Sequence, residues 1–168
     1  MRATFIVFWL AGAMLTAQTR PIVEFQRAAD AYAFLHRQVE RRLGMPHQRA
    51  MIDAPELAAA IIAERRRAGQ PALFTPAVVS TFRELAAGAL HHGCDAGELR
   101  TGAWEMFHGV DSPATGSHPV SPCIAEALPA LPEELEYRSA GTVLLLVDTH
   151  ANLVIDVLPA LLAGSEIR

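Results

Sequence analysis

The sequence contains no lysine, so all 14 of its basic side chains are arginines. Because 18 acidic residues outnumber them, the formal net charge is −4. The chain is mildly acidic and has no long basic stripe, so we do not expect it to bind nucleic acid. Hydrophobic residues make up 51% of the chain and charged residues 19%, which is typical of a folded globular protein.

The sequence also lacks the short motifs that mark the common catalytic and cofactor sites. It has no G-x-S-x-G nucleophile elbow, no H-E-x-x-H zinc motif and no glycine-rich phosphate loop. We therefore predict no cofactor, and the absence of an identifiable nucleophile argues against a hydrolase.

The only long apolar run lies at the N-terminus. Met1-Arg2 supplies a positive start, residues 3–14 are almost wholly apolar, and Ala17 is a small residue after which a signal peptidase could cut. The run is shorter than the roughly 20 residues that span a bilayer. The pattern predicts a cleavable signal peptide over residues 1–17, with an uncleaved anchor or a buried helix as alternatives.

A signal peptide implies that the mature protein works outside the cytoplasm. Residues 18–168 have the length of a single domain and contain no further apolar run of spanning length. We expect a periplasmic or secreted protein whose partner is another protein or a small molecule. The sequence does not indicate an oligomeric state.

Apolar residues at helical spacing, together with capping residues, predict four to five helices. A short helix is expected after Ser121, which is a candidate N-cap. The intervening segment 109–120 is rich in glycine, proline and serine and indicates a surface loop. The predicted helices run from Val23 to Leu43, from the capping box Asp53–Glu56 to Ala68, from Thr75-Pro76 to Leu90, from Asp95 to Phe107, and from Pro122 to Leu128.

The last forty residues have the pattern of strands. The segment Leu135–Ser139 alternates apolar and polar residues, whereas Thr142–Val147 and Leu153–Leu158 are short, nearly continuous apolar runs. Three strands are marginally stable alone, so the helices must cover at least one face of their sheet. The predicted fold class is therefore α+β, with the helices followed by a C-terminal three-stranded antiparallel β-meander in one domain.

The two cysteines, Cys94 and Cys123, are candidates for a disulfide. Their even number and the oxidising compartment that export implies favour a bond. The alternative is two unpaired, buried thiols.

A histidine-rich segment offers a candidate metal site. His91 and His92 stand next to Cys94, and His108 follows some turns later. Imidazole and thiolate are ligands of zinc and copper, but this spacing matches no standard motif. The alternative is a helix end at which histidines compensate the dipole, and a disulfide at Cys94 would remove the best ligand.

Asp148 and His150 are the candidate catalytic residues. They lie in the turn between the last two strands, and a His–Asp pair can serve as a general base. The alternative is that Asp148 and Asn152 supply turn chemistry alone.

Two polar residues interrupt apolar patterns. His36 lies on the apolar side of the first helix, where the sequence predicts a buried, hydrogen-bonded histidine rather than a ligand. Asp156 interrupts the last strand and must reach solvent or a partner, for which Arg138 is a candidate.

Three segments of the sequence resemble segments of other bacterial proteins. They are LPALPEELEYRSAGTVLLLVDTHANLVIDVLPALL at 128–162, LFTPAVVSTFRELAAGAL at 73–90 and FQRAADAYAFLHRQVE at 25–40. Together they resemble a group of uncharacterised exported bacterial proteins, small secreted or periplasmic chains with no known activity.

The leading functional hypothesis is a non-catalytic envelope protein that acts by binding or as an accessory to a partner. One alternative is a small hydrolase or metal-dependent enzyme that uses Asp148 with His150, or the histidines at 91 and 92. Another is a metal carrier or sensor based on those two histidines.

Overall fold

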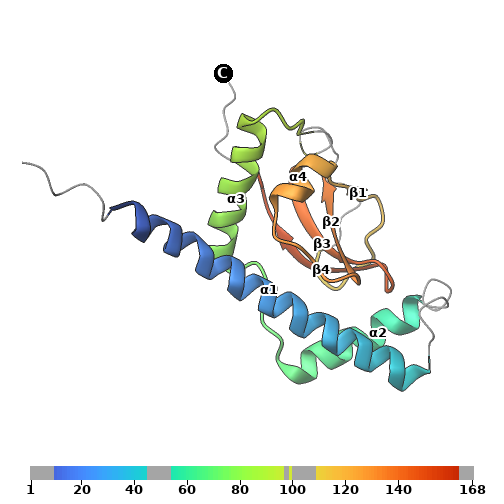
Figure 1. Ribbon diagram of the computed structural model, residues 1–168. Helices are drawn as coiled ribbons and strands as arrows, with labels where there is room; N and C mark the ends of the chain where they lie inside the picture. Colours follow the sequence, from blue (N-terminus) through green and yellow to red (C-terminus); the bar gives the residue numbers. More distant parts are fainter. Residues whose placement is uncertain (1–9, 45–53, 97–98, 100–108, 163–168) are drawn as a thin grey trace, which may run out of the picture.

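The computed structural model describes residues 10–44, 54–96, 99 and 109–162, and shows an α+β fold (Figure 1). None of the helices in these ranges combines the length and apolarity needed to cross a bilayer. The elements are α1 (Leu10–Leu43), α2 (Ala54–Ala68), α3 (Pro76–His91), β1 (His118–Pro119), α4 (Pro122–Ala127), β2 (Leu135–Ala140), β3 (Val143–Asp148) and β4 (Leu153–Leu158).

Helix α1 is longer than predicted. It ends at Leu43 as expected, but it begins at Leu10 instead of Val23 and contains Pro21. The preceding residues are mostly Leu, Ala, Met and Gln, which favour helix. Pro21 lies inside this helix, where a proline lacks the N–H for one backbone hydrogen bond and its ring crowds the carbonyl four residues earlier. The predicted cleavage point after Ala17 lies within this helix, and the signal peptide stays a prediction.

The start of helix α3 confirms its predicted capping. The Oγ1 atom of Thr75 accepts a hydrogen bond from the Val78 amide at 3.4 Å, and Pro76 occupies the first helical position. The proposed cap of α2, Asp53, lies outside the described residues, as does most of the helix predicted from Asp95 to Phe107.

The sheet contains the predicted meander and one additional strand. The order is β1-β2-β3-β4 with antiparallel neighbours, and the segment 109–120, predicted to be a loop, contributes the two-residue strand β1. A His-Pro pair is too short to show alternation, so its pairing with the edge of β2 had no sequence signal. The prediction of three strands was therefore wrong by one.

Strand β3 is buried on both faces, which explains its continuous apolar sequence. Leu144 and Leu146 face the helices, where Phe25 and Phe82 pack against Tyr137 of β2. The opposite face forms a second cluster, whose members include Ala114, Val143, Leu145, Val147 and Val154. Strand parity thus places every second residue of β3 against the helical layer.

Asp156 binds the loop between α2 and α3 rather than Arg138. Its Oδ2 accepts the backbone amides of Leu73 at 2.6 Å and Phe74 at 2.9 Å. Arg138 instead donates to the carbonyl of Ser117 at 2.8 Å. The predicted pair was wrong because register places Arg138 and Asp156 on opposite faces of the sheet.

We expect Asp156→Ala to lower the free energy of unfolding by about 3 kcal/mol, because it leaves two buried amides without an acceptor. Asp156→Asn keeps an acceptor oxygen and should cost less. Urea unfolding followed by circular dichroism measures both, and equal stability of the alanine variant and the wild type would contradict the role of Asp156.

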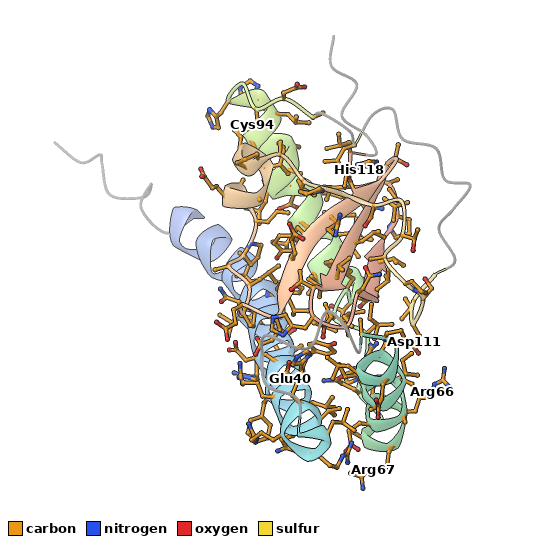
Figure 2. All side chains as sticks on the ribbon, turned by 90° about the vertical axis from the view of Figure 1, so that its right-hand side faces the viewer. Glu40, Arg66, Arg67, Cys94, Asp111 and His118 are labelled. Carbon is orange, nitrogen blue, oxygen red and sulfur yellow. A yellow bond between two sulfur atoms is a disulfide. The ribbon has the colours of Figure 1, made fainter. Side chains whose placement is uncertain are left out.

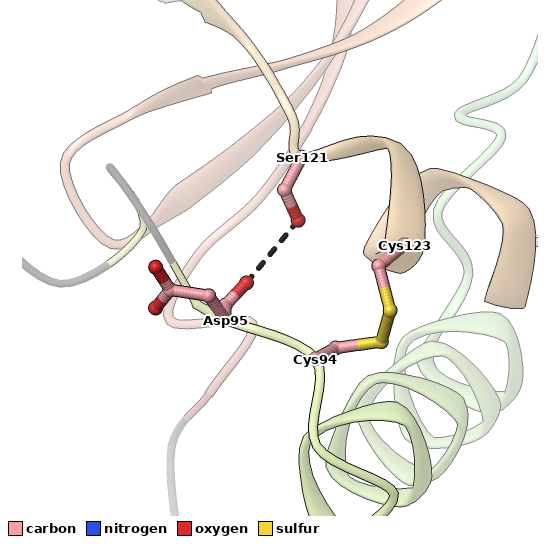
Figure 3. The surroundings of a disulfide bond; sticks show 4 residues. All are labelled: Cys94, Asp95, Ser121 and Cys123. Atoms are coloured by element: carbon pink, nitrogen blue, oxygen red, sulfur yellow. Dashed lines mark hydrogen bonds between the residues drawn. A yellow bond between two sulfur atoms is a disulfide. The ribbon is translucent and has the colours of Figure 1, made fainter.

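A disulfide joins Cys94, after α3, to Cys123 in α4, as predicted (Figure 3). Their Cα atoms are 5.7 Å apart. Ser121 stands at the N-cap position of α4, but its hydroxyl makes no cap and donates to the carbonyl of Asp95 at 3.2 Å. Its predicted capping role was therefore wrong, because the hydroxyl is used to connect the two segments.

Replacing both cysteines with serine should destabilise the protein by about 3–4 kcal/mol, because the bond closes a loop with a sequence separation of 29. The measurement is urea unfolding of the wild type and the double variant without reductant. A reductant should lower the stability of the wild type alone, and no difference between the two proteins would contradict a stabilising bond.

Candidate functional site

Five polar side chains meet where the C-terminal half of α1 crosses the end of β3. We call this group the polar cluster: Tyr32, His36, Glu40, Asp148 and His150. The first three are spaced four residues apart and therefore share one face of the helix. Figure 2 labels Glu40 on this part of α1. Asp148 ends β3, and His150 lies in the turn that follows.

Asp148 is the centre of the cluster. Its Oδ2 accepts hydrogen bonds from the Tyr32 hydroxyl and from His36 Nδ1, both at 2.5 Å. Its Oδ1 accepts the backbone amides of His150 at 3.0 Å and Ala151 at 2.8 Å. One fully buried carboxylate thus orients a helix histidine through its ring and a turn histidine through its backbone.

The second nitrogen of His36 faces two further polar groups. His36 Nε2 lies 3.0 Å from Glu40 Oε1, and His150 Nδ1 lies 3.2 Å from the same oxygen. One donor atom from each of these three side chains lies within 4.8 Å of the others. The Nε2 atom is buried, and its contact with Glu40 is close but not aligned as a hydrogen bond.

A third buried carboxylate, after those of Asp148 and Glu40, flanks the cluster. Glu134 is fully buried and accepts a hydrogen bond from Arg37 of α1 at 2.6 Å. Its other oxygen, Oε2, has no hydrogen-bond partner. The guanidinium of Arg65 lies 5.8 Å from the ring centroid of Tyr32, a cation–π distance.

The cluster shifts the pKa values of its members. Burial raises the pKa of Tyr32 well above its ordinary value, and the negative charge of Asp148 adds to this. Burial alone would lower the pKa of His36, but the hydrogen bond to Asp148 and the charges of Asp148 and Glu40 outweigh it and raise that pKa. Burial would raise the pKa of Glu40, but His36 and His150 lower it. The contacts within the cluster therefore favour a proton on His36 and a charged Glu40.

The donor set fits a transition metal. Two tetrahedral zinc ligands at about 2.0 Å from the ion lie about 3.3 Å apart. The distances from Glu40 to the two histidine nitrogens, 3.0 and 3.2 Å, are close to this value, and the three donor atoms all lie within 4.8 Å of one another. Two imidazoles and one carboxylate suit zinc and its neighbours better than calcium or magnesium, which prefer oxygen ligands.

The structure brings Asp148 and His150 together, but not as a side-chain pair. Asp148 accepts the backbone amide of His150, whereas the imidazole of His150 contacts Glu40. The histidine side chain that binds Asp148 is His36. The turn chemistry predicted for Asp148 is present as well, because its Oδ1 accepts the two amides that follow.

The other candidate residues lie elsewhere. His91 and His92 are exposed at the end of α3, next to the disulfide, with ring centroids 5.7 Å apart. Figure 2 shows this end, marked by Cys94, well away from Glu40. Cys94 cannot supply a thiolate while it is bonded to Cys123. His108 lies outside the described residues.

Sequence reasoning missed Tyr32 and Glu40 of the cluster, and the neighbouring Glu134. It predicted correctly that His36 is buried and hydrogen-bonded. However, it rejected His36 as a metal ligand and proposed no role in a site for Tyr32, Glu40 or Glu134. One signal was present, because His36 and Glu40 are four residues apart on a helix and so can contact one ion.

Comparison of the chain with protein-family models, with curated protein sequences and with solved structures finds no match.

Proposed function

We propose that this chain is an exported protein that binds a divalent transition metal of the zinc class, with His36 Nε2, Glu40 and His150 Nδ1 as ligands. The convergence of these three donor atoms within 4.8 Å carries the proposal. One of them, His36 Nε2, is a buried imidazole nitrogen that lies 3.0 Å from Glu40 Oε1 without an aligned hydrogen bond, and a metal ion between the two atoms would satisfy both.

The groups around the ligands support the proposal. Metal-binding histidines usually donate their second ring N–H to a carboxylate, which fixes the tautomer and makes the ligand nitrogen more basic. Asp148 accepts this bond from His36, and the Tyr32 hydroxyl holds the carboxylate from a second direction. With the Nδ1 proton held by Asp148, a metal ion that displaces the proton from His36 Nε2 would meet an electron pair directed toward Glu40 and His150.

The charge of the region also favours a cation. Glu40, Asp148 and Glu134 are three buried carboxylates at one helix–sheet junction, and a buried negative charge requires a compensating positive one. Arg37 pairs with Glu134, and His36 contacts the other two. A dication that displaces the proton from His36 would strengthen the compensation at the centre of the cluster.

A periplasmic or secreted location is part of the proposal. The apolar segment at residues 1–17 and the disulfide between Cys94 and Cys123 support it, because such bonds persist in oxidising compartments. In this setting a metal-binding domain can act as a carrier or a sensor. Either role agrees with the binding protein expected from the sequence.

Equilibrium titration of the metal-stripped protein with zinc tests the proposal, with a chromophoric chelator as competitor. We expect one equivalent to bind, and we expect the double variant His91→Ala/His92→Ala to bind as the wild type does. Loss of binding in this double variant would assign the metal to the exposed histidines at the end of α3. No binding to the wild type would overturn the proposal outright.

A metal-dependent hydrolase is the second candidate. The observation that favours it is the ligand set, because two histidines and one glutamate hold the zinc of several hydrolases. The side chain of His150 is 20% exposed, so a substrate would reach a bound ion from the side of His150. Zinc-dependent hydrolysis of a chromogenic ester or phosphate that disappears in Glu40→Gln would support an enzyme. Failure of zinc to produce turnover would leave the carrier or sensor as the function.

A further inference from the structure

We infer that the metal acts as a clamp: its occupancy determines how firmly the C-terminal half of α1 is held on the end of the sheet, which makes the protein a metal sensor. This inference rests on the proposed metal site and specifies its role. Two features support it: the positions of the three ligands in the chain, and the other contacts that hold α1 on the sheet.

The ligands come from opposite ends of the chain. His36 and Glu40 belong to α1, whereas His150 lies 110 residues beyond Glu40, in the turn after β3. All three can contact one ion only while α1 is docked on that turn. Metal binding therefore contributes its free energy directly to docking, because the undocked helix cannot hold the ion with all three ligands.

The two halves of α1 are held differently. Phe25, in the N-terminal half, packs into an aromatic group with Phe74, Phe82 and Tyr137. In the C-terminal half, the side-chain hydrogen bonds to the sheet region are polar links between buried groups: Tyr32 and His36 to Asp148, Arg37 to Glu134, and Glu40 to His150.

Polar links of this kind contribute little net stability, because desolvation of the groups offsets their attraction. The C-terminal half of α1 also buries Ala29 and Val39 in the apolar core, so it stays packed on the domain without metal, and an ion would add its binding free energy to the polar contacts with the end of β3. Arg42 near the end of α1 pairs with Glu64 of α2 at 3.2 Å, an exposed ion pair that adds little to the docking of the helix.

Hydrogen exchange measured by mass spectrometry tests the clamp on the purified protein, with zinc as the probe. With free zinc 100-fold above its dissociation constant, amides that exchange when this half undocks should slow by about 100-fold. We expect this protection in residues 33–43 and 148–152. The amides of α3, which supplies no ligand, should change little.

Glu40→Gln serves as the matched variant, measured with and without zinc: it lacks the anionic ligand, so zinc should give it no protection. Zinc that binds the wild type without slowing exchange in residues 33–43, or that slows all amides equally, would overturn the clamp and leave the metal site standing. Absence of zinc binding in the parallel titration would overturn the metal site and the clamp together.

Discussion

Replacing Glu40 with glutamine is expected to weaken zinc binding by at least about 100-fold, more than the loss of an outer hydrogen-bonding group causes. The substitution keeps the size of the side chain but removes the only anionic ligand, whose oxygen lies 3.0 Å from His36 Nε2 and 3.2 Å from His150 Nδ1. A neutral amide oxygen is a much poorer zinc ligand than a carboxylate. Competition titration against a chromophoric chelator measures the change.

Glu24→Gln is the matched control, because it makes the same chemical change on the same helix. Glu24 is exposed and pairs with Arg20 at 2.9 Å. We expect zinc affinity in this variant to equal that of the wild type. Equal affinities of Glu40→Gln and Glu24→Gln would exclude Glu40 as a ligand.

Replacing Asp148 with asparagine is expected to weaken zinc binding by about 10–100-fold, although Asp148 does not touch the ion. An asparagine can keep one oxygen toward the amides of His150 and Ala151, but it then presents an NH₂ group to Tyr32 and His36. His36 Nδ1 must become an acceptor, which moves the ring proton to Nε2 and removes the electron pair that binds the metal. The free energy of unfolding should also fall by about 3 kcal/mol, because a buried network is broken.

Asp156→Asn separates the two effects. Asp156 is also a buried aspartate of the sheet that accepts backbone amides, but it serves the loop between α2 and α3. It should lower stability and leave zinc affinity unchanged. If Asp148→Asn loses stability but keeps the zinc affinity of the wild type, Asp148 is a structural residue only.

Local patterns in the sequence predicted much of the fold. The three main strands were placed within about one residue at either end, because alternation and short apolar runs are read within the strand itself. The same holds for the start of α3, where Thr75 and Pro76 form the cap. Strand β1 was missed because its pairing depends on the exposed edge of β2, which is not a local property.

The candidate site could be predicted only in part. Asp148 and His150 were selected because they lie in a turn, and His36 because it interrupts an apolar stripe. Their meeting depends on how α1 packs across the sheet, a contact between residues 112 apart in sequence. Strand parity could have placed Asp148 on the helical face with Leu144 and Leu146, but not opposite His36.

The most direct test of the metal site is an anomalous difference map, recorded at the zinc absorption edge from a crystal of the zinc-loaded protein. We expect one strong peak about 2.0–2.2 Å from His36 Nε2, from a Glu40 carboxylate oxygen and from His150 Nδ1. A peak at His91 and His92 with none between α1 and the β3–β4 turn would contradict it.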